Sequence, residues 1–216
     1  MSARDAILGR ILTALVGEAD TIAPTYELWP AGTWKNPNDL FERFAEELQR
    51  VQGESKRCKS STDARQYLQD LHQALGIPQT IFVDHPICRD LLHDFENTSA
   101  LDPTLDRKQL AAIPLAIMPA KFLLADTGTA VVFPQNHAER LLCYLPDVSV
   151  LIAGADSVVA HLSDIWETMA TQANDPELRG EMLLVTGPSR TADIEKKLVL
   201  GAHGPRRLVV ILIEER

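Results

Sequence analysis

A chain of 216 residues is long enough to bury a sizeable core, and its 45 % hydrophobic and 24 % charged content is that of a globular protein. Its net charge of −9 argues against non-specific binding to nucleic acid and against a basic patch for membrane surfaces. The three cysteines show no CxxC spacing, which indicates reduced thiols and excludes zinc and iron–sulfur signatures. With no signal peptide and no apolar run near the ~18 residues of a membrane span, we expect a cytoplasmic protein.

Residues 1–52 are predicted to form a helical appendage. Apolar residues recur at helical spacing over residues 2–16 and again from Asn38 or Asp39 to Gln52, so each stretch predicts a helix. Between them, residues 18–37 hold three large aromatic side chains and no period. We favour packing of these aromatics on the domain over their presentation to a partner.

Residues 53–216 are predicted to form an α/β domain, because strands and helices alternate along this part of the chain. The expected fold is a three-layer, Rossmann-like arrangement with a mostly parallel sheet. The expected strands are 55–60, 80–83, 122–125, 130–133, 148–153, 182–185 and 208–213. The strands 122–125 and 130–133 are expected to form a hairpin. The expected helices are 62–76, 86–95, 155–172 and 192–200, and residues 96–110 are expected to be a surface loop.

The stretch with most site-like chemistry is 186–205, which reads TGPSRTADIEKKLVLGAHGP between two apolar runs. It predicts a strand–loop–helix–strand unit whose loop lies at the carboxyl end of a strand, where such folds bind ligands. Gly187, Ser189 and Thr191 would turn backbone N–H groups towards an anion at the helix start. Arg190 adds a guanidinium fork for a carboxylate or phosphate, so these four residues are substrate-binding candidates.

Helix capping is the structural alternative for this loop. Asp193 and Glu195 fall in the first turn of the expected helix, where acidic side chains complement the helix dipole. The same two carboxylates are candidate catalytic groups. The residue pattern leaves both interpretations open, and Arg190 favours the ligand.

A catalytic Ser189–Asp193–His203 arrangement is not expected. A helix over residues 192–200 would be ~13 Å long and would return the chain to the opposite edge of the sheet. His203 would then lie far from Ser189. It is expected to cap the helix end or to meet a neighbouring subunit of a homo-oligomer.

A second polar loop, Asp126-Thr127-Gly128-Thr129, joins the strands of the expected hairpin. It is either a plain turn or a second wall of the site, with Thr127, Gly128 and Thr129 binding substrate and Asp126 as a third catalytic candidate. Arg140 is either an anion clamp or a solvated surface residue. The six histidines show no HxH or HExxH spacing, so we expect no metal site.

Three segments carry a resemblance to a known family: LLADTGTAVVF (123–133), RLLCYLP (140–146) and the long motif at 186–205. With them the chain resembles the LUD-domain family, in particular its lactate-utilisation members. The resemblance implies a Rossmann-like sheet related to that of phosphosugar isomerases, acyl-CoA transferases and folate cyclo-ligases. It also implies a three-component system that oxidises L-lactate to pyruvate, in which the two other components are iron–sulfur subunits. Where the family often has Glu before TGT, this chain has the shorter Asp126.

Two functions are consistent with these features. The first is an accessory subunit of a lactate-oxidising complex, which binds a small anionic metabolite or its partner proteins and needs no cofactor of its own. The second is a free-standing isomerase- or transferase-like enzyme that acts on a phosphorylated or CoA-linked metabolite. The residues do not decide whether the chain is catalytic.

Overall fold

The computed structural model describes residues 3–15, 37–174, 181–194, 197–201 and 203–215, and the chain divides into two compact units, Met1–Pro30 and Ala31–Arg216. The first unit contains α1 (Ala3–Leu15), the helix expected over residues 2–16. The second unit begins before α2 (Pro37–Arg50), so the division expected after residue 52 does not coincide with the observed one. None of the described helices is both long and apolar enough to cross a membrane.

The main sheet has six strands, and every pair of neighbours is parallel, which confirms the expected mostly parallel α/β fold. Its central strands are continuous apolar runs, as required when both faces of a sheet are covered. In spatial order the strands are β1 (Glu54–Ser60), β12 (Arg207–Glu215), β7 (Val148–Gly154), β4 (Leu115–Pro119), β2 (Thr80–Phe82) and β3 (Thr98–Ala100).

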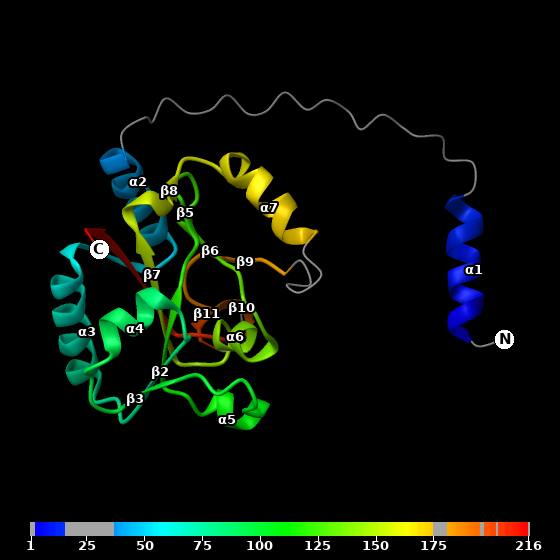
Figure 1. The fold of residues 1–216 in the computed structure, drawn as a ribbon. Helices are drawn as coiled ribbons and strands as arrows, with labels where there is room; N and C mark the ends of the chain where they lie inside the picture. The colour runs from blue at the N-terminus through cyan, green and yellow to red at the C-terminus, as the bar shows by residue number, and fades with distance from the viewer. Residues whose placement is uncertain (1–2, 16–36, 175–180, 195–196, 202, 216) are drawn as a thin grey trace. The chain divides into compact units, whose positions relative to one another are not determined.

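Two helices, α3 (Ser61–Leu75) and α4 (Pro86–Leu92), cover one face of the main sheet (Figure 1). Ser60 caps α3 by accepting a hydrogen bond from the Asp63 N–H. Alternate residues of the central strands, such as Val150 and Ile211, are fully buried against these helices. The segment expected as a loop over 96–110 contains β3 and the short helix α5 (Arg107–Ala111).

A second, four-stranded sheet covers much of the opposite face, together with α2. Its order is β8 (Val158–Val159), β5 (Phe122–Leu124), β6 (Thr129–Val132) and β9 (Leu183–Val185), and β5 and β6 form the expected hairpin. Phe44 and Leu48 of α2 are fully buried in the core that it shares with both sheets. Figure 1 shows α7 (Trp166–Ala173) outside the second sheet, so the layers run helix, sheet, sheet, helix.

Two predicted helices are wrong. Residues 155–172 form η1 (Ala155–Ser157), β8, η2 (Leu162–Ile165) and α7 in place of one helix. The described residues of 192–200 lie in β10 (Arg190–Ile194) and β11 (Lys197–Leu200), which pair antiparallel as a hairpin. The β-branched side chains in this second segment favour an extended backbone. The stretch 186–205 is therefore no strand–helix–strand unit, and β9 and β12 belong to different sheets.

Candidate functional site

The structure places residues 126–129 next to the start of the 186–205 stretch. β6 begins at Thr129 and pairs with β9, which ends just before Thr186. The Oγ1 atoms of Thr129 and Thr186 are 2.7 Å apart, and the Thr127 hydroxyl donates to Thr129 Oγ1 over 2.8 Å. Thr129 is buried, whereas Thr127 and Thr186 are exposed. We call residues 126–129 with Thr186 and Gly187 the threonine turn.

The end of α2 fills the space beside both glycines of the threonine turn. A Cβ atom on Gly128 would fall on the backbone nitrogen of Leu48, and one on Gly187 would lie 2.9 Å from the Val51 carbonyl oxygen. Both glycines also have positive φ, +63° and +82°, which other residues rarely adopt. Their role in this structure is thus to admit Leu48 and Val51 at the end of α2.

Asp126 ends the parallel pair of β5 and β8 in contact with a histidine. Its backbone N–H donates to the Ala160 carbonyl over 3.1 Å, which places it beside His161. Asp126 Oδ2 lies 3.0 Å from His161 Nδ1, and the two side chains are 30 % and 16 % exposed. Within the described part of the chain, Oδ1 of Asp126 is buried and has no hydrogen-bond partner.

His161 was not among the predicted site residues, because the helix expected over residues 155–172 placed it on a helix surface. The signal that could have found it is the β-branched pair Val158-Val159, which is separated from it only by Ala160. Such a pair favours a strand. The next residues then lie at the carboxyl end of that strand, the end at which parallel folds bind ligands.

Ser189 lies against the residues that follow the β10–β11 hairpin. Its N–H donates to the Pro205 carbonyl over 2.8 Å, and its carbonyl accepts from the Gly201 N–H over 2.9 Å. A Cβ atom on Gly204 would be 3.0 Å from Ser189 Cβ and 3.3 Å from its Oγ. We call Ser189, Arg190 and the described residues from Gly201 to Arg206 the serine turn.

His203 belongs to the serine turn and is exposed, so the prediction that it lies at the opposite edge of the sheet is wrong. The physical reason is that a hairpin reverses the chain, whereas the expected helix would have carried it across the sheet. Ser189 and His203 form no hydrogen bond with each other in the described structure. The geometry therefore supplies no Ser–His nucleophile pair.

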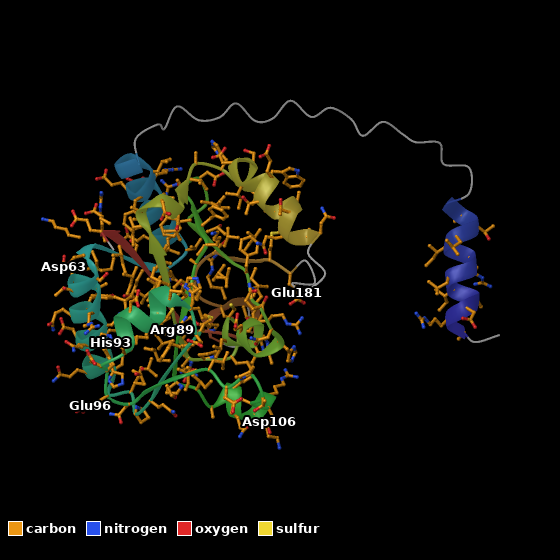
Figure 2. The ribbon with its side chains drawn as sticks, viewed as in Figure 1. Asp63, Arg89, His93, Glu96, Asp106 and Glu181 are labelled. Carbon is orange, nitrogen blue, oxygen red and sulfur yellow. The ribbon has the colours of Figure 1, made fainter. Side chains whose placement is uncertain are left out.

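Arg140, for which the sequence left open an anion clamp or a solvated surface residue, contacts other side chains. It donates to Glu181 over 2.6 Å, and its second terminal nitrogen lies 2.6 Å from His137 Nδ1. Figure 2 shows Glu181 on the second-sheet side of the unit, away from Arg89 of α4 and from His93, which follows that helix. Burial raises the pKa of the nearby Tyr144, although Arg140 acts in the opposite direction.

The other candidates lie on or next to the β10–β11 hairpin. Thr191 is paired with Val199, and Asp193 lies within β10. Glu195 falls outside the described residues. Among the residues that the structure does describe, no group of three or more His, Cys, Asp and Glu side chains is placed to hold a metal ion.

Comparison with known proteins identifies the family. Residues 41–213 match the LUD domain. The chain is similar to "Lactate utilization protein C" of Geobacillus kaustophilus, with 31 % identity over 119 residues that cover 53 % of this chain and 50 % of the relative. The protein of the same name from Geobacillus thermodenitrificans is 30 % identical over 121 residues, which cover 56 % and 50 %. The chain thus spans about half the length of the curated relatives that it matches.

One solved structure shares the fold. The crystal structure of a DUF162 family protein from Deinococcus radiodurans superposes with a TM-score of 0.58 at 18 % identity. The superposition covers 82 % of this chain and 98 % of that one. At this identity the likeness supports the fold alone.

Proposed function

The chain belongs to the LUD-domain family, and on that premise we propose that it takes part in L-lactate utilisation as an accessory subunit. In this role it binds a small carboxylate and works in the cytoplasm with iron–sulfur partner proteins. The observation that carries the proposal is the similarity to proteins named Lactate utilization protein C. The serine turn supports it, because Arg190 is exposed there beside a fixed Ser189.

Growth on L-lactate tests this role. Deletion of the gene is expected to abolish growth on L-lactate as sole carbon source and to leave growth on pyruvate unchanged. The intact gene restores growth. If the deletion strain oxidises L-lactate at the normal rate, the proposal is lost.

Association with partners is tested separately. A tagged copy, purified from cells grown on L-lactate, is expected to bring down proteins that show the visible absorbance of iron–sulfur clusters. A tagged copy recovered alone under these conditions would contradict the proposed association with partner proteins. The role in L-lactate utilisation would then be tested by the growth experiment alone.

The second candidate is an enzyme that acts on a phosphorylated or CoA-linked metabolite, and the Asp126–His161 pair favours it. A carboxylate that holds an imidazole over 3.0 Å is a common arrangement in proton transfer. Turnover of a sugar phosphate or CoA ester that disappears in Asp126→Asn would support it. A complete lack of thermal stabilisation by sugar phosphates, CoA and folates would count against it.

A further inference from the structure

We propose that the serine turn is the carboxylate-binding site, and that Arg206 acts there with Arg190. The sequence motif indicated Arg190 alone. This assignment rests on the proposed binding of a small carboxylate and names the residues that would hold it.

The backbone brings the two arginines near the same end of the hairpin, with Arg190 on β10 and Arg206 in the bend just before β12. Arg190 begins β10 and is paired with Leu200 of β11. Gly201 follows Leu200, and a Cβ atom on Gly201 would fall on Cγ of Arg206. The aliphatic part of Arg206 therefore crosses the chain next to the residue that opposes Arg190. An arginine side chain is long, so both guanidinium groups can contact one ligand beside Gly201.

Among the described residues, neither arginine has a carboxylate as close as the one that the adjacent Arg207 binds. Arg207 binds both carboxylate oxygens of Glu54 over 2.6 and 2.7 Å, and this hydrogen bonding raises its pKa. Arg206 is 3.8 Å from Asp147, and both of those side chains are 72 % exposed, so water screens the pair. Arg190 is exposed and forms no ion pair with a described residue.

Two neighbouring cations without close counterions repel each other, and a bound anion would remove that cost. Guanidinium groups bind a carboxylate through two parallel hydrogen bonds. Ser189 supplies a hydroxyl beside them, and it is held in place by backbone hydrogen bonds at both its N–H and its carbonyl. Gly204 has no side chain to displace the Ser189 Oγ.

The test is calorimetric titration of the full chain with sodium L-lactate and, separately, with inorganic phosphate. Wild-type protein is expected to bind L-lactate, and more weakly at higher salt. Arg190→Ala and Arg206→Ala should each weaken binding about tenfold or more, because each loses hydrogen bonds to a charged group. Arg190→Lys keeps the charge without the fork and should lie between wild type and Arg190→Ala.

Arg89→Ala is the matched control, since it removes the same charge from an exposed side chain on α4 (Figure 2). It should leave binding unchanged. Failure of both alanine variants to weaken binding would overturn the assignment, and so would binding of phosphate without L-lactate. If neither anion binds the wild-type chain, the site is lost, whereas growth on L-lactate still decides the proposed function. Thermal unfolding shows whether each variant is folded. If Arg206→Ala is unfolded, the comparison of Arg190→Ala with Arg190→Lys still tests the assignment of the site.

Discussion

The threonine turn and the serine turn both contain glycines in a polar loop, yet the two glycine sets have different neighbours. Gly128 faces the Leu48 backbone and Gly187 faces Val51, both at the end of α2, whereas Gly201 and Gly204 face the side chains of Arg206 and Ser189. The first turn is closed by a helix anchored in the core, and the second presents exposed polar side chains. At these four glycines, the neighbouring atoms distinguish a turn that is closed by packing from a turn that presents polar side chains.

The largest expected effect concerns the anchor that closes the threonine turn. Phe44→Ala removes a fully buried ring that stacks on Phe41, with ring centroids 5.8 Å apart. We expect the free energy of unfolding in urea to fall by about 3–5 kcal/mol. Trp166→Ala, at a residue 65 % exposed, is the control and should cost far less. Equal losses would mean that α2 is not anchored as described.

Gly128→Ala should be next in size. The added methyl group meets the Leu48 backbone at a positive φ, so overpacking and backbone strain together should cost about 2–4 kcal/mol in urea unfolding. Gly76→Ala is matched for φ, +58°, and has no atom within 4 Å of its added Cβ. It should lose only about 1–2 kcal/mol, the strain alone. Equal costs for the two variants would remove the close approach of α2 as the reason for Gly128.

Thr129→Val tests the hydroxyl chain that joins the two motifs. The substitution keeps the shape and removes hydrogen bonds to Thr127 and Thr186, whose exposed hydroxyl groups can bond to water instead. A loss of about 1 kcal/mol is expected in the same unfolding measurement. No measurable loss would show that the contact between the motifs is carried by the β6–β9 pairing alone.

The smallest effect is expected at the serine turn. Asp147→Asn removes the distant, solvent-screened partner of Arg206 and should change stability by less than about 0.5 kcal/mol. Because Arg206 then has no competing carboxylate there, affinity for L-lactate should rise slightly. A clear drop in stability would show that Arg206 is committed to a structural ion pair, as Arg207 is.

Local patterns predicted those parts of the fold that depend on burial and turns. The apolar runs at 148–153 and 208–213 are β7 and β12, and the DTGT segment turns the β5–β6 hairpin with Gly128 at positive φ. These features follow from residue types that lie next to one another in sequence. They could therefore be predicted from the sequence alone.

The secondary structure of the segment 192–200 could not be predicted in this way. Glu195, Lys196 and Lys197 favour a helix, whereas Ile194 and Val199 favour a strand, and periodicity does not separate the two states in so short a stretch. Because a helix was expected there, His203 was predicted at the opposite edge of the sheet. The contact between Arg206 and Gly201 could not be predicted for the same reason. The close approach of Gly128 and Leu48 is likewise a long-range contact that no local pattern records.

The order of strands in the main sheet bears on how the chain is made on the ribosome. β1 stands at the sheet edge beside β12, the last strand of that sheet to be synthesised, with Glu54 opposite Val209. While the intervening chain is translated, β1 has no strand of the main sheet to pair with, whereas β2, β3, β4 and β7 can already assemble. Non-local pairing of this kind slows folding and prolongs the exposure of an unpaired edge. The edges of β1 and β7 that face β12 therefore stay unpaired until β12 has left the ribosome and pairs with both strands.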